Sequence, residues 1–414
     1  MPRLPGANKR RFIPFRKRDI VEMCIQDGRL SGQEDTFRQL YYMLSSVFHF
    51  EFHQIIEALK NRYGPLDPDA DTRPIVHAAP LPELDFVELL GGLLEKANYE
   101  PVSQYDLTQA MHEASLFQIR LQVDFSDFSE VLLFCRGEST RQETLRSWMG
   151  LIKKTITFTN YDRVVVYLRF REDLVLTKTP MPLCRPGATM LKLFQNVPKA
   201  DLEMLFPNTQ VRMRMVDKLF IGIPAVISGG IVLTTKLGAT LVLMGSLFGF
   251  WLGLHSQPVE LNQATLIALL AGLGALGGYI WKQFSNFKNR KLRFMQTLTQ
   301  NLYFKNLDNN AGVFHRLADD AEEEECKEAL LAYYFLLMSS QPISKVELDR
   351  AIEAWMASQW QCDINFEIDD ALNKLLALGL VEENKGRLTA IAIRAAIQKL
   401  DQRWDDYFIP ERTN

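Results

Sequence analysis

Apolar residues recur at helical spacing in the first quarter of the chain. The helices that this spacing predicts cover residues 37–59, 84–97 and 103–114. Gly64 and Pro65 follow the first of them as stop signals, and Ser103 is a suitable N-cap for the third. We therefore predict a helical region over residues 19–116, preceded by a basic arm at residues 1–18.

The hydrophobic period changes to two after residue 116. Strand-like runs rich in β-branched and aromatic residues are expected at residues 116–125, 130–137, 155–171 and 173–179. The sequence between the second and third runs, residues 140–154, predicts a helix. These elements indicate a small α+β domain over residues 117–211, with helices on one face of a sheet.

The end of the chain predicts a winged-helix-like domain over residues 294–414. A helix from Cys326 is followed by a second, for which Ser344 and Glu347 have the spacing of a capping box. A third helix is stopped by Gly379, and two short strands around a glycine turn and a last helix follow. Helix, helix, helix, two-stranded wing and helix is the order of a winged-helix fold.

The centre of the chain is the most apolar part. It holds runs at residues 219–235, 237–254 and 264–281, each close to the roughly 17–25 residues that cross a bilayer. We predict a membrane segment over residues 212–293, with spans at 237–255 and 264–282. The run at 219–235 is then a re-entrant piece or an alternative span, because glycines and Pro224 interrupt it.

Charge and glycine spacing extend this prediction. Lys and Arg flank the segment on both sides, which favours an even number of spans and places both termini on the cytoplasmic or matrix side. Glycines four residues apart, at Gly245, Gly249, Gly253, Gly274 and Gly278, predict close helix packing within the hairpin or a homo-oligomer contact.

The predicted fold class is therefore an α+β membrane protein. It has an N-terminal helical region with a small β-sheet region, a central transmembrane helical hairpin and a C-terminal winged-helix-like domain. A buried hairpin in a large soluble protein is the less favoured alternative. The basic arm is expected to be solvated or to contact anionic lipid, with a mitochondrial targeting segment as the alternative.

The C-terminal region is acidic, which affects the choice of partner. From Asp319 to Asn414 there are 10 Lys or Arg and 20 Asp or Glu, a net charge of −10. Such a surface repels phosphate backbones, so the winged-helix order favours protein partners over nucleic acid or membrane-tethered DNA. The predicted partners are the lipid bilayer and other proteins bound through this acidic domain.

Cofactor signatures are missing from the sequence. The five cysteines are far apart and form no CxxC pair, which excludes the usual zinc spacings and a disulfide framework. The P-loop pattern GxxxxGK[ST] and a GxSxG elbow do not occur. Cys135 and Cys184 each precede an arginine, without a histidine partner. No cofactor and no catalytic residue is predicted.

The polar stretch around residues 308–320 is the strongest remaining candidate for chemistry. Asp308, His315 and Asp319 are candidate metal ligands, because they combine carboxylates with one imidazole. The next acidic run, residues 322–325, is expected to occupy the first turns of a helix, where the helix dipole favours carboxylates. Asn310 is expected in a turn, because asparagine tolerates a left-handed backbone.

A second candidate pair is His49 and His53, four residues apart on the first long helix. With Glu57 they share one helix face, a spacing that can hold a metal ion. Without the HExxH pattern or an indicated third ligand, a structural or surface role is favoured.

Several phrases of the sequence resemble a known family. They are "NLYFKNLDNNAGVFHRLADDAEEEECKEALLAYYFL", "RRFIPFRKRDIV", "LKLFQNVPKADLEMLFP", "DKLFIGIPAV" and "DDALNKLLALGLV". Together they are similar to the domain-of-unknown-function family that includes mitochondrial transmembrane protein 143, from about Arg11 to Phe408. The resemblance implies a membrane protein with two spans, located in a bacterial inner membrane or a mitochondrial membrane. It implies no known activity, cofactor or catalytic residue. The third apolar run departs from that pattern.

The function predicted from the sequence is that of a non-enzymatic scaffold or adaptor. It would be an integral membrane protein of unknown biochemical activity that presents soluble domains on the cytoplasmic or matrix side. The alternative is a membrane-associated enzyme, or a ligand or metal sensor, that uses the polar residues around 308–320.

Overall fold

The structure, a computed structural model, describes residues 10–71, 85–103, 120–147, 152–173, 186–212, 238–253 and 263–408. The chain divides into two compact units, and each combines segments that are distant in sequence. Unit 1 consists of Met1–Ala114, Asp124–Asn208 and Lys305–Asn414, and unit 2 of Ser115–Val123 and Thr209–Phe304. The predicted boundaries at residues 117 and 294 therefore differ from the observed ones.

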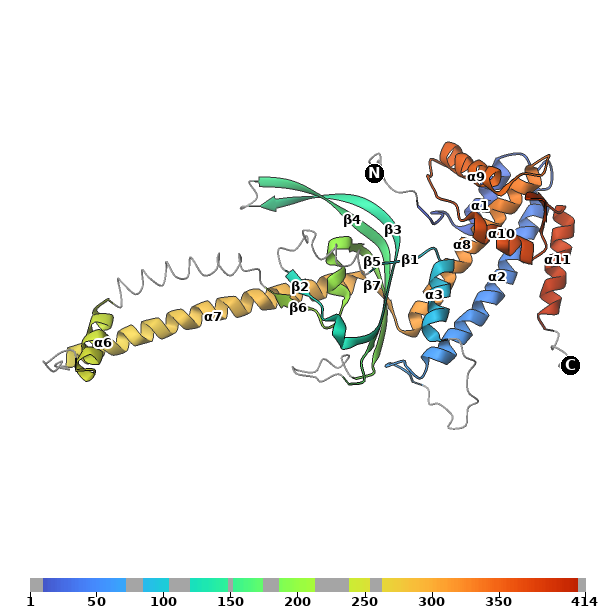
Figure 1. Cartoon of the computed structure of the whole chain (residues 1–414). Helices are drawn as coiled ribbons and strands as arrows, with labels where there is room; N and C mark the ends of the chain where they lie inside the picture. The colour runs from blue at the N-terminus through green and yellow to red at the C-terminus, as the bar shows by residue number, and fades with distance from the viewer. Residues whose placement is uncertain are drawn as a thin grey trace, which may run out of the picture. The chain divides into compact units, whose positions relative to one another are not determined.

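Unit 1 contains helices and one large sheet (Figure 1). Its helices are α1 (Lys17–Gln26), α2 (Glu34–Tyr63), α3 (Phe86–Lys96), α8 (Ala311–Met338), α9 (Lys345–Trp360), α10 (Ile368–Ala377) and α11 (Ile393–Asp406). Its strands are β1 (Glu100–Pro101), β3 (Phe128–Ser147), β4 (Ile152–Phe170), β5 (Thr189–Pro198), β7 (Asn306–Asn309), β8 (Val381–Asn384) and β9 (Arg387–Ala390). Two short 3₁₀ helices, η1 (Phe125–Asp127) and η2 (Lys199–Leu205), adjoin the sheet strands.

The main sheet is antiparallel and has the order β1-β3-β4-β5-β7. β7 begins more than a hundred residues after β5 ends in the chain, yet Leu193 pairs with Asp308. The sheet is therefore completed by a strand from the region that we predicted to belong to the C-terminal domain.

The helix predicted over residues 140–154 is wrong. Residues 140–147 continue strand β3, and Thr140 pairs with Thr159 of β4. The local sequence has acceptable helix formers such as Gln142 and Leu145. The cross-strand pairs with a Thr- and Ile-rich partner override that weak preference.

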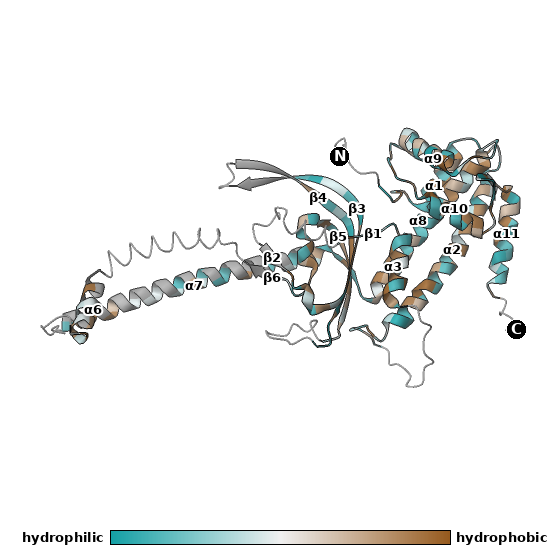
Figure 2. Cartoon of the chain, in the orientation of Figure 1, coloured by the Kyte–Doolittle hydropathy of each residue, from teal (hydrophilic) through white to brown (hydrophobic). Residues whose placement is uncertain are grey.

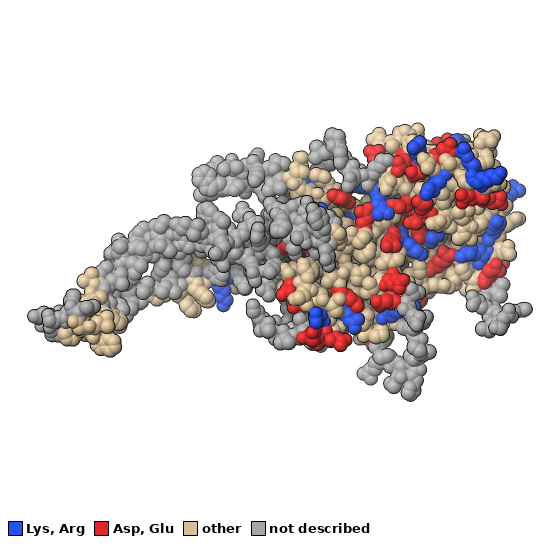
Figure 3. All heavy atoms as spheres, in the orientation of Figure 1, with Lys and Arg blue, Asp and Glu red and all other residues tan. Residues whose placement is uncertain are grey.

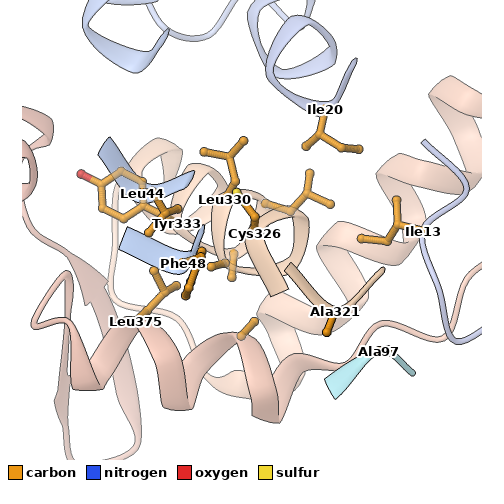
Figure 4. Packing of buried hydrophobic residues seen from close by; sticks show 14 of the residues in the cluster. Ile13, Ile20, Leu44, Phe48, Ala97, Ala321, Cys326, Leu330, Tyr333 and Leu375 are labelled. Atoms are coloured by element: carbon orange, nitrogen blue, oxygen red, sulfur yellow. The ribbon is translucent and has the colours of Figure 1, made fainter. Parts of the chain in front are cut away.

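Helix α8 is the centre of unit 1. It packs against α1, α2, α3, α9 and α10 as well as β5 and β7. Figure 4 shows Ile13, Leu44 of α2, Leu330 of α8 and Leu375 of α10 in one cluster of buried side chains. The N-terminal helices and the C-terminal elements thus share one hydrophobic core and are not separate domains.

Amphipathic patterning places the helices around this core. The helix expected at residues 37–59 lies within α2, and that expected at 84–97 contains α3. Figure 2 shows hydrophobic and hydrophilic residues sharing these two helices. The helix expected at residues 103–114 falls almost wholly outside the described residues.

The C-terminal elements follow one another in the expected order, from α8 and α9 to α10, β8, β9 and α11. The predicted capping box of α9 is confirmed, because the Ser344 and Glu347 side chains each bond the other's backbone N–H. After α10 the chain turns at Gly379, whose φ is +66°, before the β8–β9 hairpin.

Unit 2 contains a short β2–β6 pair and two helices. Its strands are β2 (Arg120–Gln122) and β6 (Gln210–Arg212), and its helices are α6 (Gly238–Trp251) and α7 (Gln263–Lys305), the last residue of α7 belonging to unit 1. An added Cβ at Gly245, Gly274 or Gly278 would meet nothing within 4 Å. These three glycines therefore do not bring helices into close contact in the described part of the chain.

The predicted integral membrane protein is contradicted by these helices. The 14 residues of α6 extend only about 21 Å, less than the roughly 30 Å of a hydrocarbon core. α7 runs for 43 residues, well past the apolar sequence and through Lys282 and Lys288. Within the residues described, no helix combines the length and apolar character needed to cross a membrane.

Four predictions change with this finding. They are the transmembrane hairpin at 237–255 and 264–282, the membrane fold class, the bacterial or mitochondrial membrane location with its topology, and the membrane-bound scaffold or sensor. The run at 219–235 lies outside the described residues. Hydropathy read over a local window does not show how the apolar sequence is divided. Part of it lies in the short helix α6, and part in α7, which is much longer and partly basic.

Asn310 joins the sheet to α8 and gives the first testable prediction. Its φ of +48° bears out the expected turn, and its buried amide links β5 to α2. Its Oδ1 accepts from Tyr63 Oη at 2.9 Å and from Leu191 N at 3.3 Å.

We expect Asn310→Gly to lower the free energy of unfolding by about 1–3 kcal/mol, because these hydrogen bonds are lost. Asn310→Ala should cost about 1–2 kcal/mol more, because alanine also disfavours a positive φ. Urea denaturation measures both, with exposed Asn309→Ala as the control. Equal stability of the Gly and Ala variants would contradict the backbone part of this argument.

Candidate functional site

Residues 10–16, which we call the N-terminal arm, lie along α8. Ile13 N donates to Glu324 Oε2 at 3.0 Å, and Lys327 Nζ donates to Ile13 O at 2.7 Å. Just after the arm, Lys17 N donates to Glu323 Oε2 at 2.9 Å. The prediction of a solvated arm is therefore wrong for these residues, because buried backbone groups of the arm are satisfied by α8. Residues 1–9 lie outside the described residues.

The acidic run of α8 is not at a helix N-terminus. α8 begins at Ala311, so the run lies in the middle of the helix and the helix dipole cannot explain it. The buried charged residues of α8 are Glu322, Glu324, Glu325, Lys327 and Glu328, which we call the buried charge row. Buried charges at this density require partners from other elements.

Those partners come from four other elements. Glu322 contacts Lys17 and His49, the latter at 2.8 Å between Oε2 and Nδ1. Glu324 accepts from Arg136 Nη2 of β3 at 3.0 Å, and Glu325 pairs with Lys374 of α10. The buried charge row thus fastens α1, α2, β3 and α10 to α8.

Glu328 differs from its neighbours, because no cation pairs with it among the described residues. Its Oε1 accepts from Asn98 Nδ2 at 2.8 Å. Burial raises the pKa of Glu328 well above its ordinary value, and the nearby carboxylate of Glu324 adds to the effect. The structure therefore favours the protonated, neutral form of this side chain.

A cleft of about 500 Å³ opens beside the arm, and we call it the arm cleft. It is lined by Arg10, Arg11, Phe12, Asn98, Glu100, Pro101, Val102, Cys135, Arg136, Gly137, Glu138, Tyr161, Lys199 and Asn365. Four of these side chains are basic and two are acidic. Every lining residue belongs to unit 1.

Two of the four cations are already paired. Arg136 lies against Phe12, with its Cζ 4.7 Å from the ring centroid, and its Nη1 is 3.3 Å from Asp320 Oδ2. Arg11 bonds Glu367 at 2.5 Å and Glu100 at 3.2 Å. These two arginines shape the cleft while their charge is largely balanced.

The other two cations, Arg10 and Lys199, remain able to bind an anion. Arg10 Nε is buried without a hydrogen-bond partner, although the Arg10 guanidinium stacks on Phe12 at 5.4 Å. Lys199, at the start of η2, forms no ion pair with any residue that the structure describes. A buried donor without a partner is costly, so an anion at this place would supply what the protein lacks.

Gly137 makes the β3 wall of the cleft. Its φ is +75°, and an added Cβ would lie 2.6 Å from Asp162 Oδ2 of β4. Only glycine fits this backbone without displacing the side chain of Asp162. The wall between Arg136 and Glu138 therefore depends on a residue without a side chain.

The residues that we predicted as metal ligands are placed differently. Asp308 Oδ2 on β7 pairs with Arg316 Nε at 3.1 Å, while His315 and Asp319 are exposed on α8. Among the residues that the structure describes, no group of three or more His, Cys, Asp or Glu side chains is placed to hold a metal ion.

His49 and His53 line a second cleft, of about 580 Å³, together with Glu322 and Trp404. The sequence had indicated Glu57 as the acidic neighbour on the same helix face. The structure supplies Glu322 from α8, which hydrogen-bonds His49 and is already paired with Lys17. This contact favours the structural interpretation of His49.

Several residues of the arm cleft had no recognisable signal in the sequence. Arg10 and Arg11 belong to the basic arm, and Arg136 follows Cys135. Nothing in the local sequence marks Asn98 or Lys199 as a binding residue. These residues come from four different segments, and no local spacing relates one segment to another.

Comparison with known proteins gives one family match. Residues 161–312 match a family described as "Protein of unknown function (DUF3754)". The match includes Tyr161 and Lys199 of the arm cleft and ends at the start of α8. No solved structure matches the chain.

Glu328 gives a pH-dependent prediction. Its pKa is raised in the folded state, so the fold binds its proton more tightly than the unfolded chain does. Its contribution to stability is full below an unfolded pKa of about 4.3 and decreases as pH rises. Glu328→Gln keeps an acceptor for Asn98 and cannot ionise.

We therefore expect Glu328→Gln to be more stable than the natural protein at pH 8, with a difference that shrinks toward pH 4.5. Urea denaturation across this range measures it. Glu347→Gln is the matched control. Hydrogen bonds from Ser344 lower the pKa of Glu347, so this variant should be less stable than the natural protein at pH 8. A Glu328→Gln protein that is less stable at pH 8 would disprove the neutral-carboxyl assignment.

Proposed function

We propose that the protein binds a small anionic ligand in the arm cleft. The observation that carries this proposal is the pair of cations, Arg10 and Lys199, that face the cleft without ion-pair partners among the described residues. The paired cations, Arg11 and Arg136, add donors that an incoming anion can share.

Charge supports an anion over a neutral or cationic ligand. Of the basic side chains in the cleft, Arg136 is balanced by Asp320 and Glu324, and Arg11 by Glu100 and Glu367. The remaining cations are opposed only by exposed Glu138 among the lining carboxylates. A cleft with a residual positive charge and partly desolvated walls concentrates anions.

The position of the cations supports the same conclusion. The backbone of Arg10 is fixed, because Asn365 N donates a hydrogen bond to Arg10 O at 2.8 Å. Lys199 is the first residue of η2, directly after β5. Donors held by ordered backbone lose less entropy when they bind a ligand than donors on mobile loops do. The arm cleft is therefore preformed for binding.

The test is isothermal titration with inorganic phosphate and with citrate at low ionic strength. We expect binding that weakens with added salt. Lys199→Gln and Arg10→Gln should each weaken it by about 10- to 100-fold, the value of one charged hydrogen bond of about 1.5–3 kcal/mol. Lys345→Gln on α9 is the matched control, because Lys345 pairs with Asp369 and does not line the cleft. No binding of either anion, or binding unchanged in both cleft variants, would refute the proposal.

We propose as a second function that the C-terminal region binds a basic protein. Without the buried charge row, residues 319–414 keep 16 Asp or Glu against 9 Lys or Arg, a net charge of −7. Figure 3 shows acidic and basic side chains interspersed on the visible face of unit 1, so an acidic contact would be local. Exposed Glu382 and Glu383 on β8 are the candidate residues.

Poly-lysine and duplex DNA are suitable probes at low salt. We expect poly-lysine to bind at least tenfold more weakly to a Glu382→Lys, Glu383→Lys double variant, since like charges then face each other. DNA should not bind the natural protein. Equal poly-lysine binding by the two proteins would rule out this surface.

We also propose that this chain belongs to the family that includes mitochondrial transmembrane protein 143. Support comes from two phrases that lie outside the matched residues 161–312. "RRFIPFRKRDIV" forms the arm and the start of α1, and "DDALNKLLALGLV" forms most of α10. Both segments contact α8. A structure of a member in which the equivalent arm leaves that helix would argue against it.

A further inference from the structure

We infer that the ligand of the arm cleft is a phosphate monoester on a small polyhydroxylated carbon skeleton, the chemistry of a sugar phosphate. The inference rests on the proposed function and names the class of ligand. It follows from the direction of the donors, the kind of acceptors and the absence of an open stacking surface among the residues that line the cleft.

The donors reach the cleft from three different elements. Arg10 and Arg11 come from the arm, Arg136 from β3 and Lys199 from η2. A planar carboxylate presents two oxygens in one plane and suits a single forked arginine. A tetrahedral phosphate monoester presents three terminal oxygens in different directions, which suits cations that arrive from separate sides.

The acceptors suit hydroxyl groups. Glu100 and Glu138 line the cleft and would repel a second anionic group on the ligand. Glu138 is exposed, so its carboxylate can accept hydrogen bonds from donors in the cleft. The amide of Asn365 can accept or donate, whereas Asn98 can only accept through Oδ1, because its Nδ2 already donates to Glu328 and to Arg11 O. A skeleton with one phosphate and several hydroxyl groups satisfies both sets of partners.

The aromatic side chains do not favour a nucleobase. Phe12 already stacks with the guanidinium groups of Arg10 at 5.4 Å and Arg136 at 4.7 Å. The other lining aromatic, Tyr161, is buried. A base that stacked on Phe12 would have to displace an arginine, which is a cation–π loss of about 0.5–2 kcal/mol.

The size of the cleft agrees with this class. Its volume of about 500 Å³ exceeds what a bare phosphate needs and lies in the usual range for small-molecule sites. The cleft therefore leaves space for a carbon skeleton beside the phosphate-binding cations. Its lining is polar around that space, which matches hydroxyl groups better than a hydrocarbon chain.

The test is titration of the full-length protein with six probes: glucose 6-phosphate, glycerol 3-phosphate, inorganic phosphate, glucose, adenosine monophosphate and a phosphoserine peptide. We expect glucose 6-phosphate to bind at least tenfold more tightly than inorganic phosphate, with glycerol 3-phosphate between them. Glucose should not bind measurably, and the nucleotide and the peptide should bind no more tightly than phosphate.

Two variants separate the parts of the site. Lys199→Gln should weaken glucose 6-phosphate and inorganic phosphate by the same factor, because both lose the same cation. Glu138→Gln should weaken glucose 6-phosphate by at least threefold and leave inorganic phosphate unchanged or tighter, because a repelling charge is removed. Glu88→Gln on α3, which is exposed and does not line the cleft, should change neither.

The outcomes distinguish this inference from the proposed function. If phosphate and glucose 6-phosphate bind equally, the skeleton is not recognised and the inference fails while the anion site stands. The same holds if the nucleotide or the phosphopeptide binds most tightly. If no anion binds, both fail.

Discussion

The burial of carboxylates along α8 is the constraint on which the rest of unit 1 depends. Glu324 is almost completely inaccessible and is held by Arg136 of β3, Lys327 and the arm backbone at Ile13. Removing one partner from a buried ion pair typically costs about 3–5 kcal/mol, because a charge is left without compensation. The arm, the sheet and α8 must therefore be assembled together for any of them to be stable.

The same contacts connect the buried charge row to the arm cleft. Asn98 donates to Glu328 on one side and to Arg11 O on the other, at 2.8 and 3.1 Å. Arg136 lines the cleft while it pairs with Asp320 and Glu324. An anion that drew Arg136 or Arg11 toward itself would weaken their bonds to the protein's own carboxylates. The arm cleft and the contacts that hold the arm thus share Arg11, Arg136 and Asn98.

Interruption of unit 1 by unit 2 explains why domain boundaries were misjudged. The chain leaves unit 1 after Asn208 and returns at Lys305, where β7 completes the sheet beside β5. Contacts such as Ile13 with Glu324 span 311 residues of sequence. Composition and periodicity are read over windows of one or two dozen residues, so they show segments and not the pairing between them. The membrane interpretation had the same weakness, since it took local hydropathy as a decision about architecture.

The sequence by itself determined the local features of this protein. The cores of α2 and α3, the capping box at Ser344 and the turn at Asn310 follow from period, cap chemistry and backbone preference. Only the tertiary structure decided that residues 140–147 form a strand and that the glutamates of α8 lie in its buried middle. The arm cleft was decided in the same way. The physical reason is that a strand's hydrogen bonds and a buried charge's partners come from distant segments, whereas helix period and capping involve neighbours three or four residues away.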